Sequence, residues 1–158
     1  MEKFFYGKHK TRNIIIYFVI LISWLAFIFS NSLANGSLSS AQSGRVVKLI
    51  RDIVSVFDSE AMVDAGDVRT AAHFFEFFVL GFIYYLGSFF IKGKRASLLL
   101  HSLALSLFTA FVDETLQLTS DGRVADIADM WVDFSGAIIA HMITLAVYAS
   151  YKYFKKKG

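Results

Sequence analysis

The chain of 158 residues contains no cysteine and no proline, and only 18% of its residues are charged. Without cysteine, it can form neither a disulfide nor a thiolate nucleophile or metal ligand. Without proline, no helix is forced to kink or break. The scarcity of charge, together with 56% hydrophobic residues, departs strongly from the composition of a soluble domain. We therefore expect an integral membrane protein.

Three common catalytic signatures are also absent from the sequence. It has no Gly-rich phosphate loop, no Gly-x-Ser-x-Gly nucleophile elbow and no His-Glu-x-x-His zinc motif. These absences argue against nucleotide hydrolysis, acyl-serine chemistry and zinc proteolysis. The net charge of +3 is explained by the Lys and Arg residues that accumulate on one expected membrane face. We therefore expect no nucleic acid partner.

Four apolar stretches predict transmembrane helices. A helix of about 20 residues spans an apolar layer of about 30 Å. The expected spans cover about residues 14–30, 70–91, 96–113 and 126–150. The predicted fold is an all-α membrane protein, with residues 1–158 forming one integral membrane domain.

A short amphipathic helix is expected between the first two spans. Val46, Ile50, Ile53 and Phe57 recur at helical spacing after a small-residue stretch. This helix can lie in the outer lipid headgroups or pack across the mouth of the bundle. The sequence alone favours neither position.

Charge is distributed unevenly between the two expected membrane faces. With four spans, the termini and the loop after residue 91 share one face, which carries most of the Lys and Arg residues and a single acid, Glu2. This positive-inside pattern predicts that both termini are cytoplasmic. The basic leader and the sequence Ser32-Leu33-Ala34 also permit a cleaved signal peptide. The long apolar run containing Trp24 favours a membrane anchor instead.

Ionisable residues lie within or at the ends of the last three spans, where one charge costs about 2.5–3.5 kcal/mol. Helical spacings of three and four residues predict that they share faces directed into the bundle. The expected outer-leaflet cluster comprises Arg69, His73, Glu76, Asp113, Glu114, Gln117, Arg123, Asp126, Asp129 and Asp133. Its two arginines cannot neutralise six carboxylates, so it must hold protons, water, a cation or a cationic ligand.

Each member of the cluster also has a structural interpretation. The arginines can form interfacial ion pairs, and His73 can be a hydrogen-bonded interior histidine. Asp126 can cap the fourth span. We expect His101 and His141, which are isolated in apolar sequence, to be structural.

The order and spacing of the polar motifs follow one pattern. It consists of Arg69-x3-His73-x2-Glu76, then Asp113-Glu114-x2-Gln117, then Gly122-Arg123-x2-Asp126 leading to Asp133-x2-Gly136. This pattern resembles the VanZ-like family of small bacterial membrane proteins. The chain departs from the family pattern in two places: no proline precedes Gly122, and Asp133 stands where an Asn is common.

The resemblance implies a multi-pass protein of the bacterial cytoplasmic membrane that acts in the cell envelope. For the namesake member it implies resistance to the glycopeptide antibiotic teicoplanin. Partners implied are membrane lipids, lipid-linked envelope precursors or a lipoglycopeptide antibiotic.

Two functional hypotheses follow, and we prefer the first. In a binding protein, Arg69 and Arg123 hold a phosphate or carboxylate and the acids hold amino groups or protons. The substrate-binding residues are then Arg69, Gln117, Arg123, Asp126, Asp129 and Asp133.

In a membrane-embedded hydrolase or transferase, the catalytic residues are His73, Glu76, Asp113 and Glu114. His73 or Glu76 acts as general base, and Asp113, Glu114 and Asp126 position a water or a hard cation such as Mg²⁺ or Ca²⁺. Metal chemistry predicts carboxylates that converge within about 5 Å, whereas amphiphile binding predicts a lateral groove. A third hypothesis, a structural subunit that packs through Gly136 and Ala140, leaves the cluster unexplained.

Overall fold

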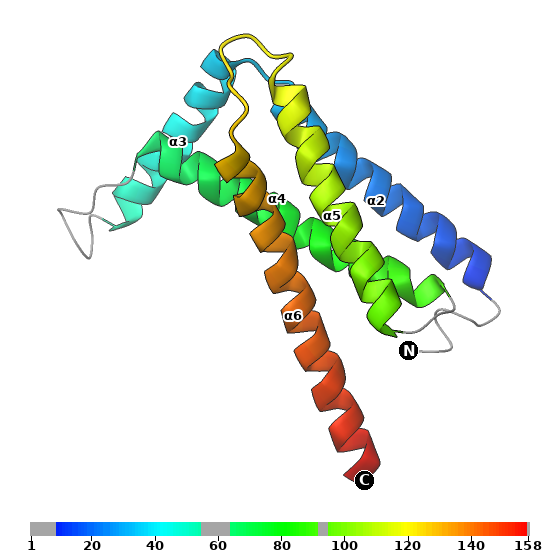
Figure 1. Ribbon diagram of the computed structural model, residues 1–158. Helices are drawn as coiled ribbons and strands as arrows, with labels where there is room; N and C mark the ends of the chain where they lie inside the picture. The colour runs from blue at the N-terminus through cyan, green and yellow to red at the C-terminus, as the bar shows by residue number, and fades with distance from the viewer. Residues whose placement is uncertain (1–8, 55–63, 92–94, 158) are drawn as a thin grey trace.

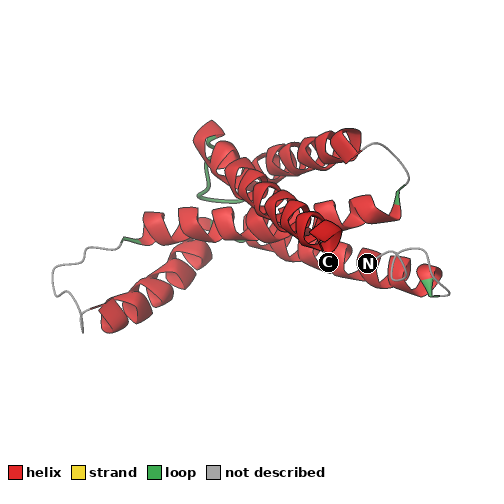
Figure 2. Ribbon diagram, turned by 90° about the horizontal axis from the view of Figure 1, so that it is seen from below, coloured by secondary structure: helices red, strands yellow, loops and turns green. Residues whose placement is uncertain are grey.

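A computed structural model describes residues 9–54, 64–91 and 95–157. Its elements are α2 (Lys10–Ser32), α3 (Gly36–Val54), α4 (Ala65–Gly87), the short 3₁₀ helix η1 (Ser88–Phe90), α5 (Arg95–Gln117) and α6 (Ile127–Lys157) (Figure 1). Figure 2 shows only helices and loops in these described ranges. By length and composition, α2, α4 with η1, α5 and α6 can each cross a membrane. The predicted all-α, multi-pass membrane fold is confirmed.

The helices α2 and α5 extend beyond the predicted spans at both ends, α6 ends later than expected, and α4 begins earlier but ends at Gly87, before residue 91. The start of α4 is at Ala65, whereas the span was expected from residue 70. Its start is fixed by a capping box, in which the Asp64 side chain accepts from the Asp67 amide at 2.8 Å and the Asp67 side chain accepts from the Asp64 amide at 3.4 Å. The polar residues at the helix ends therefore lie on regular helix and have fixed directions.

The helix α3 corresponds to the expected amphipathic segment, but it begins at Gly36, within the small-residue stretch. Val46, predicted on the apolar face, is 43% exposed, whereas its neighbour Val47 is buried. Phe57 lies outside the described residues. Because α3 leaves the end of α2 and contacts α4, it forms one wall beside the start of α4 (Figure 1).

The centre of the bundle is α4, which packs most extensively on α6 and also contacts α2, α3 and α5. Small residues allow the close crossing of α4 and α6. A Cβ added at Gly81 would lie 2.9 Å from the Ala137 Cα, and a Cβ at Gly136 would collide with the Phe74 carbonyl. The expectation that Gly136 and Ala140 allow a close helix approach is confirmed, and the partner helix is α4.

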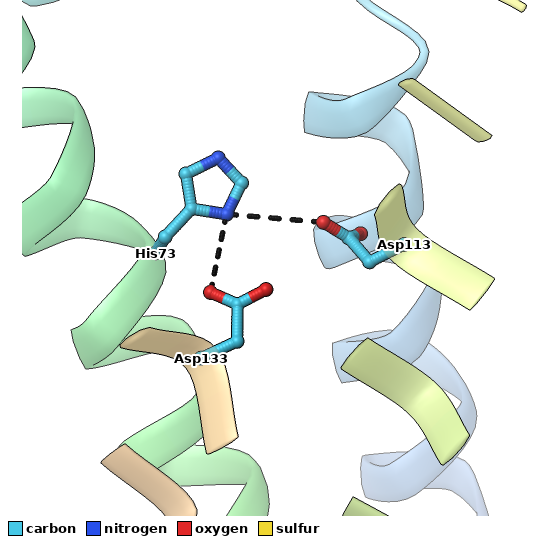
Figure 3. Close-up of side chains that lie close together, drawn as sticks. All are labelled: His73, Asp113 and Asp133. Atoms are coloured by element: carbon cyan, nitrogen blue, oxygen red, sulfur yellow. Dashed lines mark ion pairs between the residues drawn. The ribbon is translucent and has the colours of Figure 1, made fainter. Parts of the chain in front are cut away.

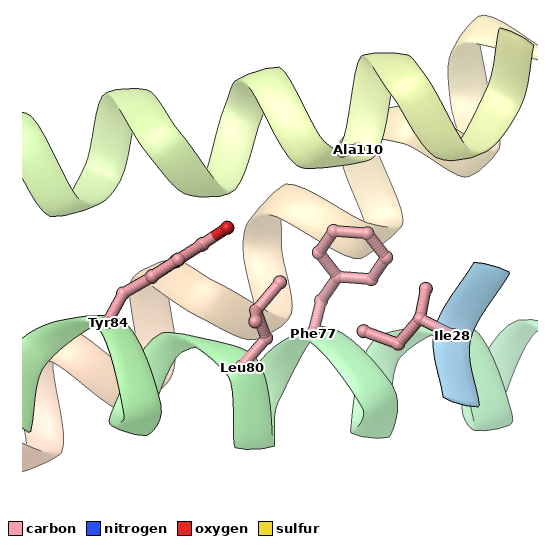
Figure 4. Packing of buried hydrophobic residues seen from close by; sticks show 5 residues of the cluster. All are labelled: Ile28, Phe77, Leu80, Tyr84 and Ala110. Carbon is pink, nitrogen blue, oxygen red and sulfur yellow. The ribbon is translucent and has the colours of Figure 1, made fainter. Parts of the chain in front are cut away.

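An apolar cluster lies in the middle of the bundle. Figure 4 shows Phe77, Leu80 and Tyr84 of α4 directed towards α5, which contributes Ala110, with Ile28 of α2 beside Phe77. All but Tyr84, which is 9% exposed, are fully buried. This cluster fixes α2 and α5 against α4 and so positions the polar residues beyond it.

Candidate functional site

The polar residues meet where α2 and α5 end and α4 and α6 begin, which we call the polar end of the bundle. Here the turn between α5 and α6 packs on the connection between α2 and α3 (Figure 1). The Gly36 amide donates to the Asp121 carbonyl at 3.0 Å, and the Ser120 hydroxyl donates to the Ser32 carbonyl at 3.1 Å. Gly122 has a φ of 73°, which allows the chain to reverse before α6.

Three buried side chains from three helices converge at the polar end. His73 of α4 places its Nδ1 atom 3.4 Å from Asp133 Oδ1 of α6 and 3.8 Å from Asp113 Oδ2 of α5 (Figure 3). Both aspartates are fully buried, and His73 is 7% exposed. We call His73, Asp113 and Asp133 the buried triad.

Asp113 is held by neutral donors on two helices. The Ser32 hydroxyl donates to Asp113 Oδ1 at 2.5 Å, and the Gln117 amide donates to Asp113 Oδ2 at 3.3 Å. Ser32 is itself fully buried at the end of α2. In the sequence, Ser32 was considered only as part of a possible signal-peptide cleavage site, and no role at the polar end was predicted for it.

Glu76 is anchored to α2 by two contacts. The Asn31 amide donates to Glu76 Oε1 at 2.7 Å, and the Trp24 indole donates to the Glu76 carbonyl at 3.0 Å. Asn31, like Ser32, was therefore a site residue without a predicted role. Its only signal in the sequence was an amide at the end of an apolar run.

Glu114 links α5 to the start of α6. It accepts from the Gln117 amide at 2.8 Å and from the main-chain N–H of Asp126 at 2.9 Å. The Asp126 side chain accepts from the Ala128 amide at 2.8 Å, which confirms the predicted N-cap of α6. These contacts give Glu114, Gln117 and Asp126 clear structural roles at the helix junction.

The two arginines have different surroundings. Arg123 donates to the Ser39 hydroxyl at 2.7 Å and to the Ser32 carbonyl at 3.4 Å, yet its buried Nε atom has no hydrogen-bond partner among the described residues. Arg69 is 48% exposed and lies 3.8 Å from Asp129. Burial lowers the pKa of the Arg123 guanidinium, and the nearby charge of Arg69 lowers it further, but arginine remains protonated at neutral pH.

A polar cavity of about 150 Å³ lies between α3 and the start of α4. Its lining residues are Asn31, Ser39, Ser43, Val46, Val68, Arg69, Ala72, His73, Glu76 and Arg123. A second hollow of about 140 Å³, which also reaches Arg69, adjoins it between the same two helices. The prediction that Arg69, His73 and Glu76 share one face is confirmed, because all three border this cavity.

The three aspartates of the predicted cluster that lie on or just before α6 have three different environments. Asp126 caps the helix, Asp129 pairs with Arg69 at the surface, and Asp133 is buried in the triad. All ten predicted residues lie at the polar end. Three of them, the residues of the buried triad, converge on one another. The ligand atoms of the triad lie within 4.8 Å of one another, within the separation of about 5 Å expected for metal chemistry.

A larger apolar groove of about 620 Å³ lies at the opposite end of the bundle. It is bordered by the first half of α2, the end of α4 and the start of α5, and it includes His101. His141, by contrast, is buried, with its Nε2 2.8 Å from the Ser102 hydroxyl and its Nδ1 2.7 Å from the Ala137 carbonyl. These contacts confirm the structural role predicted for His141.

Comparison with known proteins identifies the family of the chain. The VanZ/LLP1 family matches residues 15–148, which include α4 and α5, most of α2 and α6, and every residue of the polar end. Searches of curated proteins and of solved structures found no match. The matched region covers most of the chain, so this multi-pass membrane protein belongs to the VanZ/LLP1 family.

Proposed function

We propose that the polar cavity binds the anionic head group of an amphiphilic or lipid-linked envelope molecule, and that expression of the protein raises tolerance to teicoplanin-type glycopeptides. The observation that carries this proposal is the pair of arginines, Arg69 and Arg123, at one small polar cavity. Guanidinium groups bind phosphate and carboxylate through paired, charge-assisted hydrogen bonds. A cavity of this size accepts such a group and leaves a lipid tail in the surrounding bilayer.

The hydrogen bonds of the arginines support an anionic ligand. Arg123 retains a donor with no partner in the described part of the chain, and half-exposed Arg69 forms a long ion pair with Asp129. An exposed pair of this kind contributes little, so an incoming anion can replace it at low cost. Glu76, on the same cavity, can accept from an amino or hydroxyl group of the ligand.

The distribution of charge supports the orientation of the site. Basic residues at the start of α2, the start of α5 and the end of α6 lie opposite the polar end, and positive residues accumulate on the cytoplasmic side of membrane proteins. We therefore place the polar end in the outer leaflet of the bacterial cytoplasmic membrane, with both termini in the cytoplasm. Lipid-linked envelope molecules and teicoplanin, which carries a lipid tail, are both accessible there.

The experiment compares teicoplanin and vancomycin sensitivity in a host that expresses wild type, Arg69→Gln or Arg123→Gln, both substitutions being at residues that border the cavity, with membrane levels of each measured. Arg45→Gln is the matched control, because Arg45 is exposed on α3 and does not border the cavity. We expect wild type and Arg45→Gln to raise teicoplanin tolerance and the two site variants to lose it at equal abundance. No effect of wild type would refute the resistance proposal, and full activity of Arg69→Gln would refute the role of the cavity.

The buried triad favours a second candidate function, a membrane hydrolase or transferase acting on a lipid-linked envelope precursor. Its carboxylates and imidazole converge within 4.8 Å, which amphiphile binding alone does not require. Glu76, which borders the cavity together with His73 and both arginines, is a candidate general base. Purified wild type should then release phosphate from a prenyl pyrophosphate and Glu76→Gln should not, whereas a binding protein releases none.

A further inference from the structure

The buried triad carries an inference that holds whether or not the polar cavity binds an amphiphile. We propose that His73, Asp113 and Asp133 bind one divalent first-row transition-metal ion, with Zn²⁺ and Mn²⁺ as the chemically preferred candidates. The sequence had suggested Asp113, Glu114 and Asp126 as ligands of a hard cation. The structure instead brings His73 and Asp133 to Asp113, while Glu114 and Asp126 are engaged at the helix junction.

The first support is the state of Asp133. This carboxylate is fully buried, and neither of its oxygens accepts a hydrogen bond from any described residue. Its buried counterparts differ: Asp113 accepts from Ser32 and Gln117, and Glu76 accepts from Asn31. A buried carboxylate without a donor is strongly unfavourable. Among the described residues, the group paired with Asp133 is His73, whose Nδ1 lies 3.4 Å from Oδ1 (Figure 3), and Oδ2 has no hydrogen-bond partner there.

The second support is the imidazole. His73 Nδ1 points between the two carboxylates and makes no hydrogen bond with the residues that the structure describes (Figure 3). Its separations of 3.4 and 3.8 Å from the carboxylate oxygens exceed the length of about 2.7–2.9 Å of a charge-assisted hydrogen bond. In addition, a single proton on Nδ1 can donate a well-aligned hydrogen bond to only one of the two carboxylates.

A metal ion explains these separations. Ligand atoms bound at about 2.0–2.2 Å by one tetrahedral ion lie about 3.3–3.6 Å from one another, close to the separations of His73 Nδ1 from the two carboxylates. A dication would also balance the two aspartates with His73 neutral. The hydrogen bonds from Ser32 and Gln117 to Asp113 are of the kind that orient metal-binding carboxylates.

The ligand set favours transition metals over Mg²⁺ and Ca²⁺. Imidazole suits Zn²⁺ and its neighbours, whereas Mg²⁺ and Ca²⁺ prefer oxygen ligands alone. Three protein ligands also leave coordination positions for water or for another ligand, as in catalytic rather than structural zinc sites. His73 also borders the polar cavity, so an ion bound by the triad would be close to the proposed head-group site.

The test uses the full chain, purified in detergent and stripped with a chelator, and measures Zn²⁺ and Mn²⁺ binding by equilibrium dialysis with elemental analysis. We expect one ion per wild-type chain, and Asp133→Asn to weaken binding roughly 100-fold, since even the loss of a supporting residue costs about 10–100-fold. Asp129→Asn is the matched control, because it removes the same charge one turn away on α6 from a residue paired with Arg69. Its affinity should be unchanged.

A spectroscopic measurement on wild type covers the case in which Asp133→Asn does not fold. Electron spin-echo modulation of bound Mn²⁺ should show the nitrogen of a directly coordinated imidazole. Wild type that binds neither ion at millimolar concentration would overturn the proposal. So would Mn²⁺ bound without nitrogen modulation, or folded Asp133→Asn binding as tightly as wild type.

Discussion

The substitution Gly136→Ala tests the close crossing of α4 and α6. The added Cβ would collide with the Phe74 carbonyl and lie 3.0 Å from the Phe78 amide nitrogen. Both obstacles are main chain of α4, which cannot move aside by changing a rotamer. The two helices must therefore separate, and the packing on both sides of the crossing must be lost in part.

The cost can be estimated from opposing effects. Overpacking a well-packed interior costs about 1–3 kcal/mol, and a main-chain obstacle places this case near the upper value of about 3 kcal/mol. Alanine has a higher helix propensity than glycine, so the same substitution also increases the free energy of unfolding by about 1 kcal/mol. We expect a net loss of about 2 kcal/mol in the free energy of unfolding, or roughly a 30-fold change in the folding equilibrium.

The assay is reversible unfolding in mixed micelles, followed by the fluorescence of Trp24 and Trp131. The matched control is Gly44→Ala on α3, because a Cβ at Gly44 has no described atom within 4 Å. It should be neutral or stabilising by up to about 1 kcal/mol. Gly136→Ala that is as stable as Gly44→Ala would refute the close approach of α4 and α6.

Three further substitutions test individual contacts in the same unfolding assay. Asp64→Ala removes the side-chain cap that accepts from Asp67 and should cost about 0.5–2 kcal/mol, whereas an unchanged stability would show that α4 does not begin there. Ser32→Ala removes a donor from the buried carboxylate of Asp113 and should cost about 1–3 kcal/mol; a neutral result would contradict that hydrogen bond. Trp24→Phe keeps the ring but removes the indole donor to α4, so a loss of about 1 kcal/mol is expected, and none if that bond is absent.

The sequence predicted the fold class and the composition of the polar end because both depend on local pattern. Apolar runs identify spans, and spacings of three and four residues identify shared helix faces. Their spacing alone was enough to predict that Arg69, His73 and Glu76 share one face. The N-cap role of Asp126 was likewise predictable from its position before an apolar run.

The sequence could not predict which acids converge across different helices. Asp126, Asp129 and Asp133 share one face by spacing, but the tilt of α6 over Gly136 decides that only Asp133 reaches His73. That tilt depends on main-chain contact at Gly136, which cannot be deduced from the spacing of polar and apolar residues in the sequence.

The same limitation applies to Asn31 and Ser32. They are polar residues at the end of an apolar run, a position that is common to many membrane helices. Only the packing of α2 against α4 and α5 gives each of them a buried carboxylate as its partner.

The most direct test of the central claim measures lipid binding by the protein in nanodiscs. The probes are a fluorescent long-chain prenyl monophosphate and the corresponding neutral prenyl alcohol, compared for wild type, Arg69→Gln and the control Arg45→Gln. Loss of a charge-assisted hydrogen bond costs about 1.5–3 kcal/mol, so Arg69→Gln should bind the phosphate roughly 10–100-fold more weakly. Wild type and Arg45→Gln should both prefer the phosphate strongly. Equal binding of phosphate and alcohol by wild type, or an unchanged affinity of Arg69→Gln, would contradict an anionic head-group site at the polar end.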